Sequence, residues 1–224
     1  MSKARRSRAF MIAVYLLAIA AVLFVAARGL YVGLGLHERR YPSSYFGITV
    51  YKSEVDLDRD GIDDQTDILQ SVRSYIATKP IYKSVYYDGG YPDDGFGVCT
   101  DVVAQGLLGA GYDLRALIGL DRRTYPERYE DEPIDDNIDF RRVRNQLVYL
   151  EGNAISLTTD IYQLEQWQGG DIVVFENHIG VVSDMRNSDG IALVIHHGSV
   201  TQAAYEQDIL EERKDEIVGH FRIS

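Results

Sequence analysis

Cys99 is the residue best suited to act as a nucleophile, and it is the only cysteine among the 224 residues. Glycines precede it at positions 95 and 97, and an apolar-periodic run follows from Val102, so the sequence predicts a helix that begins at Cys99. A thiol at a helix N-terminus meets unpaired backbone N–H groups and the positive end of the helix dipole, which favour the reactive thiolate. The alternative is a buried, inert thiol, which is common for an unpaired cysteine.

Two histidines could complete a catalytic set with this thiol. His178 begins a predicted strand and His196 ends the next one, with the turn signal of residues 186–190 between them. Antiparallel pairing brings both imidazoles to one end of the sheet, and they share a face if the register sets them opposite or two residues apart. If that face packs on the Cys99 helix, His178 would take the thiol proton and His196 would hold His178 in the right tautomer.

The elements that must position these residues are predicted from apolar periodicity and turn signals. We expect one helix over about residues 68–77, a second from Cys99 onward, and a short helix with a surface excursion within 112–137. The last third of the chain is predicted to be β, with strands at 171–175, 178–183, 191–197 and 217–223. His220 in the last strand is interpreted as an ordinary structural residue, and Asp101 as a cap of the Cys99 helix.

An acidic segment at residues 56–67 resembles the single calcium loops of dockerin-type modules. Carboxylates fall at loop positions 1, 3, 5, 9 and 12, and Gly61 takes the turn position. The predicted ligands of one calcium ion are Asp56, Asp58, Asp60, Asp67 and the backbone carbonyl of Ile62. Position 12 is Asp instead of the usual Glu, and position 8 is polar. The alternative is an acidic surface turn in which Thr66 or Asp67 caps the next helix.

The N-terminus carries a membrane signal. Four basic residues precede an uncharged apolar run at 10–27, and apolar character resumes through residue 36. We therefore expect a cytoplasmic tip and membrane anchor at 1–36, a stalk at 37–55, and an extracytoplasmic domain at 56–224. Cleavage after Ala27 would instead release a secreted protein.

Charge excludes one class of partner. Residues 1–40 hold seven Lys or Arg and one acid, which leaves 16 basic and 33 acidic residues for the rest of the chain. Nucleic-acid binding requires a basic footprint, so we expect no nucleic-acid partner. The arginines at 141, 142 and 144 could bind a substrate carboxylate, but pairing with the neighbouring acids is the favoured interpretation.

Several blocks of the sequence resemble the NlpC-type cell-wall cysteine peptidases. The blocks are residues 97–102 around Cys99, 170–175, 178–184 and 195–196. The fuller resemblance, over roughly residues 65–223, is to an uncharacterised bacterial family, DUF1287, through residues 90–92, the Cys99 block, 137–143 and 219–222. It implies an α+β, papain-like fold, in which a cysteine-bearing helix packs on an antiparallel sheet that bears the histidines. It also implies a catalytic set of Cys99, His178 and His196.

Three functions are compatible with these observations. The first is a membrane-anchored, extracytoplasmic cysteine amidase or endopeptidase that acts on cell-envelope peptide or amide bonds and needs no cofactor for catalysis. The second is a zinc hydrolase that uses Cys99, His178, His196 and His197 as ligands, although no short-spaced ligand pair supports it. The third is a non-catalytic, calcium-stabilised binding domain on a membrane tether.

Overall fold

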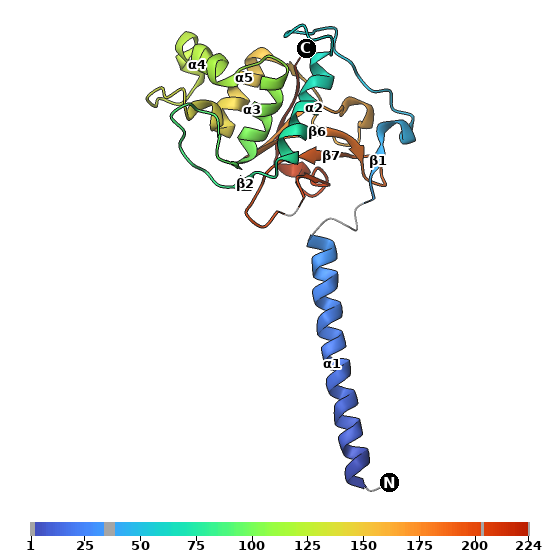
Figure 1. Ribbon diagram of the computed structural model, residues 1–224. Helices are drawn as coiled ribbons and strands as arrows, with labels where there is room; N and C mark the ends of the chain where they lie inside the picture. The colour runs from blue at the N-terminus through green and yellow to red at the C-terminus, as the bar shows by residue number, and fades with distance from the viewer. Residues whose placement is uncertain (1–2, 34–38, 203, 224) are drawn as a thin grey trace. The chain divides into compact units, whose positions relative to one another are not determined.

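The computed structural model describes residues 3–33, 39–202 and 204–223, and the chain divides into two compact units, 1–38 and 39–224. The first unit contains helix α1 (Lys3–Gly33; Figure 1). Within it, Met11–Tyr31 has a mean hydropathy of 2.4 and exposed side chains. This confirms the predicted apolar helix, which is long enough to span a membrane and is also of the kind found in signal sequences.

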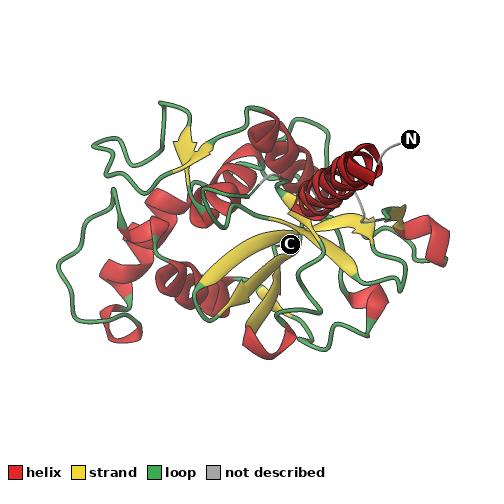
Figure 2. Cartoon of the chain, turned by 90° about the horizontal axis from the view of Figure 1, so that it is seen from below, coloured by secondary structure: helices red, strands yellow, loops and turns green. Residues whose placement is uncertain are grey.

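The second unit is built around one antiparallel sheet. Its strand order is β4-β9-β5-β6-β7-β8, with β1 paired to β6 as well. The strands are drawn in yellow in Figure 2. The strands are β1 (Tyr41–Pro42), β4 (Ile155–Ser156), β5 (Ile172–Phe175), β6 (His178–Arg186), β7 (Ala192–Ile195), β8 (Glu206–Gln207) and β9 (Ile217–Arg222). A separate parallel pair joins β2 (Ile81–Tyr82) to β3 (Phe96–Gly97) just before the Cys99 helix.

Four helices belong to this unit: α2 (Asp64–Ala77), α3 (Cys99–Gly109), α4 (Leu114–Thr124) and α5 (Val143–Asn153). Short 3-10 turns lie at Ser43–Phe46, Pro126–Arg128, Asp139–Arg141, Leu164–Gln166 and Lys214–Glu216. Glycine lets α2 and α3 pack closely, because a Cβ at Gly106 would lie 2.3 Å from Val72 Cγ2 and one at Gly109 would lie 1.9 Å from Ser71 Oγ. The sequence thus accepts glycine inside α3, at a cost in helix propensity, to bring the two helices together.

Both faces of the central strands are buried, and the two-residue period of β5 shows how. Ile172 and Val174 face a cluster formed with α2 and α3, whereas Val173 and Phe175 face a second cluster that contains Trp167 and Leu210. The predicted α+β class with an antiparallel sheet is therefore confirmed, and α3 lies on β6 as expected (Figure 1).

Several boundaries differ from the sequence prediction. Strand β6 continues to Arg186 instead of residue 183, and β7 ends at Ile195, so His196 follows the strand that it was expected to end. Helix α2 begins at Asp64, earlier than expected, because the carboxylate of Asp63 accepts the Thr66 N–H and so takes the cap position that was predicted for Thr66 or Asp67. The expected stalk at 37–55 is also wrong from residue 39 onward, since Tyr41 pairs with Arg186 and Ser43 Oγ donates to the Asp184 carbonyl. Residues 37 and 38 lie outside the described residues.

Asp171, which precedes β5, connects the sheet to α2. It is fully buried and its carboxylate accepts hydrogen bonds from five donors. The donors are Gln65 Nε2 at 2.9 Å, Gln168 N at 2.8 Å, His220 Nε2 at 3.1 Å, and Arg222 Nε and Nη2 at 2.7 and 2.8 Å. Its removal would leave the Arg222 guanidinium without its carboxylate.

We expect Asp171→Asn to lower the free energy of unfolding of the chain by about 3–5 kcal/mol, the usual cost of breaking one side of a buried ion pair. Urea denaturation of residues 39–224 measures the change. Glu212→Ala, at an exposed position, is the control and should shift stability by less than about 0.5 kcal/mol. A similar small shift for Asp171→Asn would show that this cluster does not stabilise the fold.

Candidate active site

Cys99 is the first residue of α3, as predicted, and its side chain is partly exposed. The thiol lies by the backbone amide of Ile179, the residue that follows His178. Burial raises the pKa of the Cys99 thiol, and the amides of Ile179 and Thr100 oppose that shift without overcoming it. The expected thiolate is therefore corrected: desolvation outweighs the helix terminus, and the resting thiol is neutral at pH 7.

His178 and His196 are in direct contact. His178 Nε2 lies 2.9 Å from His196 Nδ1, and the two rings meet edge to face with their centroids 4.9 Å apart. The register explains this contact, since Val181 pairs with Ile195, which sets His196 across from Gly180 and two residues along from His178. A Cβ at Gly180 would lie 3.1 Å from His196 Cβ and 2.6 Å from Val194 Cγ1, so glycine is needed there.

Both imidazoles are neutral at pH 7. Burial, helped by the charge of Arg213, lowers the pKa of His178 to about 4. Burial, helped by the charge of His178, lowers the pKa of His196 to about 3. In a neutral pair one ring nitrogen must donate and the other accept. If His178 donates from Nε2, its Nδ1 carries the lone pair and is free to accept a proton.

The face that these two histidines share differs from the one expected. His178 pairs with Phe175 across the two strands, and the centroids of their rings are 6.1 Å apart. Because side chains alternate along β6, the His178 side chain lies on the same face as Val182 and Val194. The Cys99 helix packs on the opposite side, against Ile179 and Val181. The thiol lies near the start of β6, by the amide of Ile179, and within the described part of the chain no hydrogen bond joins it to either imidazole.

Asp101 fixes the start of the cysteine helix. Its Oδ2 accepts the Val98 N–H at 2.8 Å, and its two oxygens receive Arg141 Nε and Nη2 at 2.7 and 2.8 Å. Its predicted capping role is confirmed, although the amide that it binds lies before the helix. Arg142 and Arg144 pair with Glu132, so the three arginines are engaged by acids, as the favoured interpretation stated.

Two further residues lie on the α3 side of the sheet: Tyr82, which the sequence analysis did not place in the site, and His197, which it named only as a ligand of the zinc alternative. Burial raises the pKa of the Tyr82 phenol, and the Cys99 thiolate, once it forms at high pH, raises it further. His197 meets Tyr82 edge to face at 5.2 Å, and the charge of Asp101 partly offsets the lowering of its pKa by burial. The strand period offered a signal for His197. Successive residues of a strand point to opposite faces, so His197 lies on the face opposite to that of His196. Tyr82 lies in a two-residue strand that no periodicity marks.

His220 is structural, as interpreted. Its Nδ1 lies 2.8 Å from the Thr158 carbonyl, its Nε2 faces Asp171, and its ring stacks on Trp167 at 3.8 Å. These contacts occupy both ring nitrogens.

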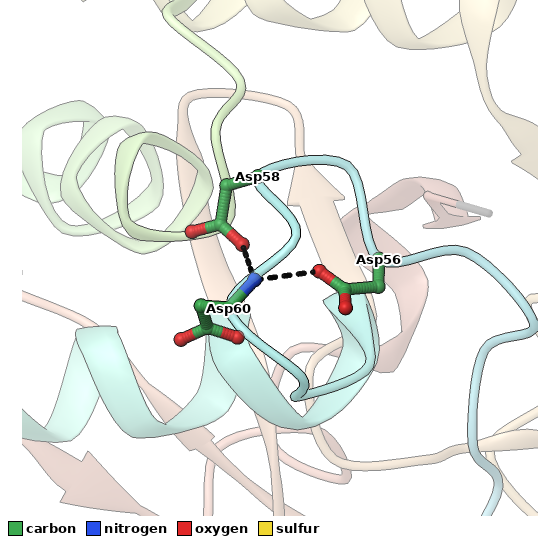
Figure 3. A group of neighbouring side chains, drawn as sticks. All are labelled: Asp56, Asp58 and Asp60. Carbon is green, nitrogen blue, oxygen red and sulfur yellow. Dashed lines mark hydrogen bonds between the residues drawn. The ribbon is translucent and has the colours of Figure 1, made fainter.

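The acidic loop brings its first three predicted ligands together. Oxygens of Asp56, Asp58 and Asp60 lie within 4.8 Å of one another, and Asp56 and Asp58 both accept the Asp60 N–H at 3.2 Å (Figure 3). Burial and the charges of these residues and of Asp64 raise the pKa of Asp67, which places the fourth predicted carboxylate close to them. Within the described residues, this is the one group of His, Cys, Asp and Glu whose ligand atoms converge; Cys99 and the histidines do not form such a group.

The comparisons with known proteins give a family. Residues 69–223 match the family described as "Domain of unknown function (DUF1287)", a stretch that includes Cys99, His178 and His196 and begins after the acidic loop. The chain is also 34% identical over 162 residues to the "Uncharacterized protein YijF" of Escherichia coli (strain K12), which covers 68% of this chain and 77% of that protein. No solved structure matches the chain. By the extent of the family match and of this relative, the chain belongs to the DUF1287 family.

Proposed function

We propose that this protein is a cysteine hydrolase of the NlpC type, anchored in the membrane, which cleaves peptide or amide bonds of the cell envelope. The observation that carries the proposal is the contact between His178 and His196 at the strand end where the Cys99 thiol lies by the amide of Ile179. The thiol and the histidine pair thus lie on opposite faces at the same end of the sheet. The proposal requires that the His178 imidazole reach the thiol around this strand end, so that nucleophile, base and orienting group act in series.

The proposed reaction has two halves. His178 Nδ1 takes the thiol proton as Cys99 Sγ bonds to the substrate carbonyl carbon, while the His196 ring holds the His178 ring through their hydrogen bond. The Cys99 N–H at the helix start stabilises the oxyanion. The C–N bond then breaks, and the proton on His178 goes to the leaving amine. Water, deprotonated by His178, attacks the thioester and releases the acid and the free thiol.

The low pKa of His178 in the resting site supports its role as a general base. A general base must be unprotonated before it accepts the proton, and a pKa of about 4 keeps His178 in that form throughout the neutral range. The zinc alternative has less support, because the ligand atoms of Cys99 and the histidines do not converge within the described residues.

We expect the Cys99 thiol to react with iodoacetamide at pH 7 about 10²-fold faster in the wild type than in His178→Ala, because general bases contribute at least that much. His196→Ala should slow the reaction less, since it removes only the orienting group. Below about pH 4 the advantage of the wild type should vanish, because His178 is then protonated.

Alkylation rates between pH 4 and 10, read by mass spectrometry, test this expectation without a known substrate. Cys99→Ser should remain unlabelled, and Val200→Ala, at an exposed position on the loop after β7, should match the wild type. If the alkylation rates of the wild type and His178→Ala depend on pH in the same way, His178 does not act as a base for the thiol. The protein is then better described as a non-catalytic binding domain.

The second part of the proposal concerns topology. Basic residues before the apolar segment favour a cytoplasmic N-terminus, which puts residues 39–224 on the outer side of the membrane. Protease added to intact spheroplasts should then digest residues 39–224 and spare a cytoplasmic marker. Complete protection of these residues until detergent is added would contradict the orientation.

The third part is a structural calcium ion held by Asp56, Asp58, Asp60, Asp67 and the Ile62 carbonyl. Four carboxylates at one loop repel one another, and this repulsion contributes to the raised pKa of Asp67. A hard divalent cation with oxygen ligands would relieve the repulsion.

We expect calcium at about 100 times its Kd to stabilise the folded chain by roughly 2.7 kcal/mol. Thermal melts in chelator and in millimolar calcium measure the effect. Asp58→Asn should melt no lower than the wild type in chelator, because it removes one repelling charge, yet gain little from calcium. Asp189→Asn, in an exposed turn, should behave like the wild type. Equal melting temperatures with and without calcium would favour the acidic surface turn.

A further inference from the structure

We propose that His197 is a further binding residue of the Cys99 site, and that its imidazole contacts an anionic oxygen of the ligand that Cys99 attacks. This inference deepens the proposed hydrolase and rests on it in one respect, namely that Cys99 is the point of attack. His197 has no part in the proton transfers assigned to His178 and His196.

The first observation is the side of the sheet on which His197 lies. Ile195 faces the cluster that contains α3, so His196 points to the other face and His197 back toward α3. Its contact with Tyr82 places its ring one aromatic side chain away from Cys99, because the Cys99 thiolate, once formed, acts on that phenol. His197 and Cys99 therefore share the α3 side, whereas His178 and His196 approach from the other side.

The second observation is the unmet hydrogen-bonding capacity of the His197 ring. Only 2% of the residue is exposed, and its Nδ1 has no hydrogen-bond partner among the described residues. Polar atoms buried in this way are normally paired, so a lone one at a candidate site indicates a partner that arrives with the ligand. Tyr82 and Tyr205 touch the ring edge to face at 5.2 and 5.1 Å and hold it in place.

The third observation concerns charge. Asp101 is the acid that acts on His197, but both oxygens of that carboxylate already bind Arg141, which leaves an imidazolium at His197 only partly compensated. An anionic oxygen would complete the pairing. The titratable and charged groups in this part of the site are Cys99, Asp101, Arg141, Tyr75, Tyr82, Tyr205 and His178.

Two thiol reagents of similar size test the charge beside Cys99. Iodoacetate carries a carboxylate and iodoacetamide does not, so the ratio of their rates at Cys99 reports the local potential. As pH falls from 7.5 through the pKa of His197, which burial lowers below its usual value, the imidazole gains a proton and the ratio should rise roughly fivefold in the full-length chain in detergent, the effect of one nearby unit charge. His197→Gln should keep the ratio flat, and Val200→Ala should follow the wild type.

A second measurement uses the wild type alone and does not depend on the folding of a variant. Alkylation with iodoacetate leaves a carboxylate fixed on Cys99 Sγ, whereas alkylation with iodoacetamide leaves a neutral amide. His197 should have a higher pKa in the first product than in the second, because the carboxylate stabilises the imidazolium. NMR titration of the histidine ring protons measures both pKa values. His197→Gln assigns the resonance.

The outcomes separate the two proposals. An equal ratio in the wild type and His197→Gln, or an equal His197 pKa in the two products, overturns this inference while leaving the role of His178 untouched. If instead the ratio responds to His197 but alkylation ignores His178, the proposed hydrolase fails and His197 remains a residue that binds anionic oxygen beside an accessible thiol.

Discussion

The carboxylate of Asp101 is the group on which the geometry of the candidate site depends. It binds the backbone N–H of Val98 and both arms of Arg141, while Arg141 also donates to the Val85 carbonyl. The Thr100 hydroxyl returns a bond to the Arg141 carbonyl. The start of the cysteine helix, the loop before it and the turn at residues 139–141 are thereby held by one buried ion pair, whose removal from either side would leave a charge without its partner.

This arrangement has a chemical consequence. Burial raises the pKa of the Cys99 thiol, the Asp101 carboxylate two residues away adds to the rise, and both work against the helix-start amides, which lower it. The fold therefore positions Cys99 accurately at the expense of its acidity. Asp171 performs the same positional role for the sheet, since it joins Gln65 of α2 to Arg222 of β9. Because α2 also packs on α3, the helix that carries the thiol and the sheet that carries the imidazoles are held to one common element.

Local patterns were sufficient to predict much of this structure from the sequence. Turn signals predicted that His178 and His196 lie at one end of the sheet, and helix-start signals predicted α3. Whether the two histidines share a face depended on the register, which the pairing of Val181 with Ile195 settles. Tertiary contacts decided the rest. The pairing of Tyr41 with Arg186 and the parallel pair at Tyr82 involve two residues each, too few to show a period. The pKa of Cys99 depends on burial by segments distant in sequence, which no local motif reports.

The side chain beside His178 is an imidazole and not a carboxylate, and this difference affects the pKa of the proposed base, His178. A carboxylate partner would stabilise the His178 imidazolium and raise its pKa, whereas His196 is neutral and, when charged, repels it. With the thiol pKa raised and the His178 pKa lowered, a stable thiolate–imidazolium pair is disfavoured in the resting site. Proton transfer must then accompany attack on the substrate, so the site would hold a protected thiol that becomes nucleophilic only when a carbonyl is in place. Such a thiol is also less open to oxidation, because the thiolate is the form that oxidants attack.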